Sequence, residues 1–206
     1  MFITLEGIEG AGKSTVQYAL AKHFQDLGRE VICTREPGGS KLGKSLRSLL
    51  LDARTQICSQ AELFLFLADR AEHMEETIKP SLAQGKVVIC DRFIHSTIAY
   101  QGGGRGIDML ALTHLNTMAI QNIMPKKVLL LDIDVQQGLT RARKRNYMHN
   151  SQVSEGRFEA EDLAFHERIR QSYLEQAKED SERFCIIDAS QSAEEVINHC
   201  IKILKD

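Results

Sequence analysis

The segment GIEGAGKST, residues 7–15, combines glycines, a lysine and hydroxyl groups at a spacing suited to binding phosphate. The pattern Gly7-x-x-x-x-Gly12-Lys13-Ser14 is that of a P-loop, whose glycines let backbone N–H groups converge on an anion. The start of the following helix adds positive potential, Lys13 supplies a cation for the β- and γ-phosphates, and Ser14 supplies a ligand for Mg²⁺. A glycine-rich turn can match this pattern by chance. Here an apolar run precedes it and an amphipathic helical pattern follows, so we predict a nucleotide phosphate site.

Short apolar runs alternate with helical patterns along the whole chain, and this alternation must position the loop. Strands are predicted at residues 2–6, 30–34, 87–91, 127–132 and 184–188, and helices at 13–27, 59–84, 108–124, 135–145, 159–178 and 193–204. The order predicts an α/β fold of one domain over residues 1–206, with a doubly wound parallel sheet. Ligands should then bind at the carboxyl ends of the strands. Residues 35–43 and 145–157 break the alternation, and the second stretch is predicted to be a mobile surface loop.

Composition narrows the possible partners and location. The formal net charge of the 206 residues is −2, so no overall basic field would recruit nucleic acid. The five cysteines form no C-x-x-C pair, and Cys33, Cys90 and Cys185 are expected to be buried, reduced thiols. No apolar stretch approaches the length of a membrane span, and the N-terminus opens directly into a predicted strand. We therefore expect a cytoplasmic protein that binds neither membrane nor nucleic acid.

A series of arginines near the predicted strand ends indicates which reaction the P-loop serves. Arg35 and Arg92 follow strands, and Arg141, Arg143 and Arg145 come after the fourth strand. A phosphate acceptor would explain them, because a nucleoside monophosphate is nearly a dianion and needs no general base. The difficulty is the repulsion between two anions, which calls for Mg²⁺, a lysine and several arginines. The N-K-x-D signature of small GTPases and the L-S-G-G-Q-like signature of ABC ATPases are both absent from the sequence.

Six motifs carry a resemblance to a known family: FITLEGIEGAGKST, TREPGGS, LRSLLLD, ELFLFLADRAEH, VVICDRFIHSTIAYQGGGRG and LLLDID. In these motifs the chain resembles thymidylate kinases of the bacterial type, whose P-loop lacks an arginine. The resemblance implies a three-layer P-loop kinase fold, with a five-stranded parallel sheet flanked by helices and a short lid at about residues 143–158. It also implies transfer of the γ-phosphoryl group of ATP to dTMP, with Mg²⁺ as cofactor, and a homodimer.

The resemblance assigns roles to individual residues. Glu9 would reach the 3′-hydroxyl of the acceptor and help organise phosphate and Mg²⁺, and Tyr100 would lie under the sugar and exclude a 2′-hydroxyl. Phe66 would stack on thymine, although its apolar neighbours also fit a core position, and Arg70 would point at O4. The implied acceptor site comprises Glu9, Arg35, Pro37, Arg47, Phe66, Arg70, Arg92, Ser96, Thr97, Tyr100 and Gln101. Arg47 could instead be an ordinary charge on a helix surface. The Glu36–Pro37 bond is expected to be cis.

On the donor side, the resemblance assigns ATP to Gly7, Ile8, Glu9, Gly10, Ala11, Gly12, Lys13, Ser14, Thr15, Arg143 and Ser190. Ser14 and Asp91 would hold the metal, and Lys13, Glu9, Arg92 and Arg145 would act in catalysis. Asp91 and Arg92 could instead form a structural ion pair with each other. Some relatives carry an arginine immediately after the acidic P-loop residue, where this chain has Gly10. Its lid should therefore supply the transition-state arginine, and the candidates are Arg141, Arg143 and Arg145. Helical spacing puts Arg141 and Arg145 on one face, so Arg145 would suit the phosphates and Arg143 the adenine side. The alternative is Arg157, in the segment RFE (157–159) that resembles the usual end of the lid.

Two other functions fit a P-loop. A deoxynucleoside kinase would need a general base near the 5′-hydroxyl and fewer arginines. A regulatory or partitioning ATPase would hydrolyse ATP without an acceptor, and such proteins tend to carry an additional lysine early in the loop. This chain has Gly7, Ile8 and Glu9 there.

Overall fold

A parallel five-stranded sheet forms the centre of the computed structural model, which describes residues 1–148 and 156–205. The strands are β1 (Phe2–Glu6), β2 (Val31–Arg35), β3 (Val87–Asp91), β4 (Lys127–Asp132) and β5 (Phe184–Asp188). Their order is β2-β3-β1-β4-β5, so β1 lies centrally and the chain crosses to either side of it. The predicted sheet is confirmed. The P-loop leaves the carboxyl end of β1, where the strand order reverses and α/β proteins bind ligands.

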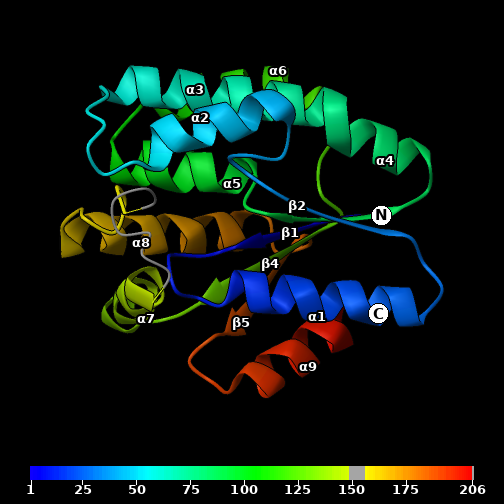
Figure 1. The fold of residues 1–206 in the computed structure, drawn as a ribbon. Coiled ribbons are helices and arrows are strands. Elements are labelled where there is room, and N and C mark those ends of the chain that lie inside the picture. The colour runs from blue at the N-terminus through cyan, green and yellow to red at the C-terminus, as the bar shows by residue number, and fades with distance from the viewer. Residues whose placement is uncertain (149–155, 206) are drawn as a thin grey trace.

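Helices cover both faces of the sheet (Figure 1). One face carries α1 (Lys13–Asp26) and α9 (Ala193–Ile203). The other carries α8 (Leu163–Glu179), α5 (Ile94–Thr97), α3 (Ser59–His73) and α4 (Lys79–Ala83), with α2 (Lys41–Leu51) and α6 (Met109–Ile120) packed outside them. Helix α7 (Val135–Met148) lies next to α8. Successive strand residues point to opposite faces of the sheet. Ile3, Leu5 and Ile89 pack in the larger core cluster. Phe2 and Val88 pack in a second cluster, together with Met74 and Ile78.

Several local features differ from the predictions. The predicted helix at 59–84 is helical throughout but contains a π-helical segment, η1 (Met74–Ile78), between α3 and α4. Helix α2 begins inside the segment predicted to be irregular, because the Ser40 hydroxyl caps it by accepting from the Gly43 N–H at 2.9 Å. A second π-helical segment, η2 (Ile98–Gly104), follows α5 and was not predicted. Helix α7 continues past Arg145 to Met148.

The cysteine prediction is only partly correct. All five cysteines lie in the described part of the chain as free thiols, and Cys90 is buried as expected. Cys33 is exposed, because β2 is an edge strand, and Cys185 is partly exposed on the opposite edge strand. Within residues 1–148 and 156–205, no helix combines the length and apolar character needed to cross a membrane.

Candidate active site

A cavity of about 560 Å³ opens at the carboxyl ends of the strands, and most of the predicted site residues line it. Of the residues predicted from the sequence, the lining contains Glu9, Gly10, Gly12, Lys13, Ser14, Thr15, Arg35, Pro37, Arg47, Phe66, Arg70, Asp91, Arg92, Ser96, Thr97, Tyr100, Gln101 and Arg145. Gly7, Ile8, Ala11, Arg143 and Ser190 do not line it. Its volume is typical of small-molecule sites.

The P-loop has the backbone that its glycines predict. Gly7, Gly10 and Gly12 have φ angles of 130°, 74° and 94°, a region that side chains disfavour. The Lys13 ammonium donates to the carbonyl oxygens of Gly7 and Ile8, each at 2.9 Å. Burial, with the nearby positive charge of Arg92, lowers the pKa of Lys13 to about 8. The lysine is therefore held by its own loop and desolvated, at the site where phosphate oxygens would add charge.

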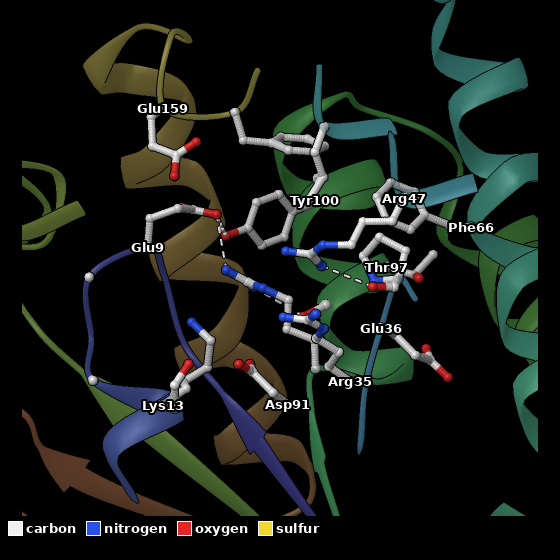
Figure 2. A pocket seen from close by; sticks show the side chains of 18 of the residues that line it. Glu9, Lys13, Arg35, Glu36, Arg47, Phe66, Asp91, Thr97, Tyr100 and Glu159 are labelled. Carbon is white, nitrogen blue, oxygen red and sulfur yellow. Dashed lines mark hydrogen bonds and ion pairs between the residues drawn. The ribbon is translucent and has the colours of Figure 1, made fainter. Parts of the chain in front are cut away.

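Glu9 faces the acceptor side of the cavity rather than solvent (Figure 2). Its Oε1 accepts from Arg92 Nη2 at 2.9 Å and from the Tyr100 hydroxyl at 2.5 Å. Burial alone would raise the pKa of Glu9, but Arg92, His166, Lys13 and Tyr100 outweigh it and lower that pKa. The fully buried His166 of α8 places Nδ1 3.5 Å from Glu9 Oε2. Glu9 is thus an ionised carboxylate fixed at the mouth of the loop.

Arg92 is held in an unusual backbone conformation at the end of β3. Its φ angle is 71°, and its N–H donates to the Leu5 carbonyl oxygen at 2.9 Å. The guanidinium lies 4.8 Å from the centre of the Tyr100 ring and donates to Ser96 and Tyr173, each at 3.2 Å. Its ion pair is with Glu9, so Arg92 does not form the structural pair with Asp91 that the sequence left open. A left-handed backbone at a non-glycine residue is strained and is often found at functional sites.

Arg70 and Phe66 border the part of the cavity predicted to hold a base. Phe66 is half-buried, 6.2 Å between ring centres from Phe158. The Arg70 side chain is almost fully buried, pairs with Glu36 at 2.8 Å, and donates through Nη1 to Thr97 at 2.8 Å and Asn116 at 2.5 Å. Burial raises the pKa of Glu36, but Arg70 and His73 reverse this and lower it overall. Arg70 therefore has a fixed direction before any ligand binds.

Hydrogen bonds connect the Arg35–Gly39 loop, which borders the predicted acceptor side of the cavity, to α3. The Glu36–Pro37 peptide bond is cis, as predicted. Asp69 accepts from the Gly38 N–H at 2.9 Å, and His73 Nδ1 contacts Glu36 at 2.9 Å. From α2, Arg47 Nη1 donates to the Pro37 carbonyl oxygen at 2.9 Å. Arg35 and Arg47 thereby reach one cavity from different elements (Figure 2), and Arg92 lines the same cavity from the end of β3.

Comparisons with known proteins decide the family of this site. A family model described as thymidylate kinase matches residues 5–200. The thymidylate kinase of Desulfovibrio desulfuricans is 55% identical, covering 97% of this chain and 93% of its own. That of Nitratidesulfovibrio vulgaris (strain DP4) is 48% identical, with 99% and 92% covered. The crystal structure of thymidylate kinase from Ehrlichia chaffeensis superposes with a TM-score of 0.81 at 36% identity, covering 100% of this chain and 98% of that one. The chain belongs to the thymidylate kinase family. It is therefore a nucleoside monophosphate kinase, an ATP-dependent phosphotransferase.

Two of the arginines of α7 line the cavity of this kinase, and the third does not. Arg141 and Arg145 of α7 both line the cavity, in agreement with their predicted common face. Arg141 Nη1 donates to the Ala189 carbonyl oxygen at 3.0 Å, next to Ser190, which the resemblance assigned to ATP. Arg143 instead lies outside the cavity lining and points at the Glu159 carbonyl oxygen, 3.4 Å away. Arg141 therefore lines the cavity and Arg143 does not, and the Ser190 hydroxyl donates to Asp188 Oδ1 at 2.6 Å.

The lid residues fall partly outside the described chain. Residues 149–155, the middle of the predicted lid, are not described. At its start, Arg145 lies 3.4 Å from Glu159 of the RFE motif. At its far end, Arg157 donates to the buried carboxylate of Glu62 at 2.6 Å and to the Leu50 carbonyl oxygen at 2.5 Å. Arg157 is therefore engaged in the thymidylate kinase scaffold, whereas Arg145 faces the cavity.

Sequence reasoning missed several residues of this kinase site. Glu36, Phe158 and Glu159 line the cavity without having been assigned to it. His166 and Tyr173 contact its charged residues from α8. Glu36 and Glu159 belong to the noticed motifs TREPGGS and RFE, which were the available signal. His166 and Tyr173 occur in an ordinary amphipathic helix, and no local pattern distinguishes them.

Proposed function

We infer that the protein transfers the γ-phosphoryl group of ATP to the 5′-phosphate of dTMP, giving dTDP and ADP. The observation that carries this inference is the pairing, in one cavity, of the P-loop lysine with three arginines from separate elements. Lys13 serves the donor, and Arg35, Arg47 and Arg92 lie where an anionic acceptor would approach it. Family membership supplies the identity of the nucleotides.

The chemistry asks the protein for positioning and for positive charge. The dTMP phosphate is already a nucleophile near neutral pH, because the second pKa of a phosphate monoester is about 6. The arginines reduce its repulsion from the ATP phosphates, and Lys13 stabilises charge on the transferring group. The cavity contains no serine–histidine or cysteine–histidine pair among its described lining residues, which is consistent with a reaction that needs no general base.

Base and sugar selection would follow from fixed groups. Phe66 offers a ring face for stacking, and Arg70 presents donors that suit the O4 carbonyl of thymine and disfavour the amino group of cytosine. Glu36, Thr97 and Asn116 hold Arg70, so little freedom is lost when the base binds. Tyr100, anchored on Glu9, is proposed to lie beneath the sugar and exclude a 2′-hydroxyl.

Mg²⁺ is the proposed cofactor, with Ser14 and Asp91 as the residues that would hold it. Asp91 Oδ1 is buried and lacks a hydrogen-bond partner among the described residues, so it can accept from metal-bound water. The Ser14 hydroxyl is exposed at the start of α1. Bound there, Mg²⁺ would supply charge neutralisation of the ATP phosphates.

We also propose that this is a single-domain kinase of the bacterial subtype, whose arginine-free P-loop is served by Arg145 from a lid at about residues 143–158. Exposed apolar side chains on α2, α3 and α6 support a homodimer: Leu49, Phe64, Leu110 and Met118 are 51–83% exposed. Five free thiols support a cytoplasmic location. We propose no membrane or nucleic-acid partner, in line with the net charge of −2. Light scattering in solution tests the dimer.

A coupled assay of ADP release tests the proposed function. The protein is incubated with ATP and Mg²⁺ alone, with added thymidine, and with added dTMP. Release that requires dTMP supports the proposal. ADP release that requires thymidine would identify a deoxynucleoside kinase. ADP release without any acceptor would identify a regulatory ATPase. Lys13→Ala should remove dTMP-dependent release without loss of the folded state, as judged by circular dichroism.

A further inference from the structure

Glu6 is a fully buried carboxylate immediately before the P-loop, and it has no assigned role in the reaction. Its Oε1 accepts from the Phe93 N–H at 2.8 Å, and its Oε2 accepts from the hydroxyls of Ser96 at 2.7 Å and Tyr173 at 2.9 Å. Burial raises the pKa of Glu6 to about 7, although these donors and Arg92 oppose the rise. A buried carboxylate is unfavourable unless its partners satisfy it, so this one depends on a dedicated set of donors.

The hydroxyls that bind Glu6 also bind Arg92. Arg92 Nη1 lies 3.2 Å from the Ser96 hydroxyl and 3.2 Å from the Tyr173 hydroxyl, and the two hydroxyls are 2.7 Å apart. Each hydroxyl has one proton and two lone pairs. Each proton goes to Glu6 or to the other hydroxyl, and at least one goes to Glu6, so lone pairs are left to face the guanidinium. Glu6 therefore sets the direction in which both hydroxyls accept from Arg92.

Glu6 also holds the backbone of Arg92. Its Oε1 fixes the N–H of Phe93, the residue directly after Arg92. The N–H of Arg92 itself binds the Leu5 carbonyl oxygen, directly before Glu6. The left-handed conformation of Arg92, with φ of 71°, is thus held from both sides by the end of β1. One carboxylate constrains Arg92 at its main chain and at its guanidinium.

We propose that Glu6 and Tyr173 are positioning residues that orient the Arg92 guanidinium for the acceptor phosphate. The proposal rests on the proposed function, in which Arg92 binds that phosphate. The hydroxyl contacts are neutral, so they fix the guanidinium without cancelling its charge. Tyr173 comes from α8 and Glu6 from β1, and neither side chain lines the cavity.

Calorimetric binding of dTMP and of thymidine separates this role from a general structural one. The two ligands differ only in the phosphate that Arg92 would bind. The measurement uses the full chain and two variants. Tyr173→Phe keeps the ring and removes the hydroxyl. Glu6→Gln carries an amide that donates to the hydroxyls instead of accepting from them, which reverses the direction of those hydrogen bonds. Tyr18→Phe and Glu30→Gln change exposed residues in the same chemical way and are the matched controls.

Each test variant should reduce the preference for dTMP over thymidine by about tenfold, the usual size of one lost hydrogen bond to a charged group. Thymidine affinity and both controls should match wild type. An unchanged preference in Tyr173→Phe, or equal weakening of both ligands, would overturn the proposal. If the wild-type protein itself binds dTMP no better than thymidine, the proposed function fails instead. Should Glu6→Gln not fold, Tyr173→Phe alone decides.

Discussion

The close approach of Gly10 to α7 predicts that this P-loop cannot accept a side chain after Glu9. A methyl group at Gly10 would lie 2.0 Å from the Gly138 carbonyl oxygen, and the φ angle of Gly10 is 74°. The left-handed conformation costs an ordinary residue about 1–2 kcal/mol. Overpacking against the α7 backbone adds about 1–3 kcal/mol. Gly10→Ala should therefore lower the free energy of unfolding by about 2–5 kcal/mol.

Gly28→Ala isolates the contribution of the close approach. Gly28 has a φ angle of 73°, and no described atom lies within 4 Å of a methyl group placed there. It should lose only the conformational part, about 1–2 kcal/mol in urea denaturation. Gly10→Ala should also lower kcat, because Arg141 and Arg145 follow Gly138 along α7 and would move with it. The reasoning is refuted if the two variants have the same free energy of unfolding and Gly10→Ala keeps the wild-type kcat.

Further predictions concern the charges and the ring around the substrates. Burial and Arg92 lower the pKa of Lys13 to about 8, so its ammonium group is charged below that pH. The kcat/KM for ATP should therefore fall as the pH rises above about 8. A kcat/KM that stays constant to about pH 9.5 would contradict this. Arg145→Ala should lower kcat by a factor on the order of 10³ with little change in the dTMP KM. Arg157→Ala should instead lower the melting temperature. Steady-state kinetics and calorimetry test both variants, and a loss of kcat in Arg157→Ala with a wild-type kcat in Arg145→Ala would contradict the assignment. Tyr100→Ala should lose preference for dTMP over ribothymidine monophosphate, and Tyr100→Phe, which retains the ring, should keep it; equal ratios of kcat/KM in both variants would exclude the steric explanation.

Short-range patterns were enough to predict the sheet and the P-loop. The central strands appear in the sequence as apolar runs because helices cover both of their faces. The P-loop is evident from the spacing of Gly7, Gly12 and Lys13. The start of helix α2 fell inside a segment predicted to be irregular, because it depends on a capping bond between Ser40 and the Gly43 N–H. The prediction that Cys33 is buried was wrong because β2 is an edge strand, and the order of strands in a sheet cannot be predicted from a short sequence segment.

The nucleotide side shows a second limit of sequence reasoning. Helical spacing placed Arg141 and Arg145 on one face, but it could not say which face meets the cavity. Contact between Gly10 and Gly138 fixes how α7 lies on the P-loop, and this contact turns Arg141 toward Ala189. A tertiary contact between two glycines thus decides which arginines of α7 line the cavity.

The way Arg92 is held follows from what it must bind. An arginine that receives a phosphate dianion cannot be fully neutralised by its own protein, yet a buried guanidinium without partners would be unstable. Arg92 satisfies both needs by dividing its contacts, with one ion pair to Glu9 and neutral hydroxyls of Ser96 and Tyr173 on the other nitrogen. An arriving phosphate can compete for the Glu9 side while the hydroxyls keep the orientation. The negative charge that directs those hydroxyls is Glu6, placed one step further from the cavity, where it helps hold Arg92 without binding its guanidinium directly.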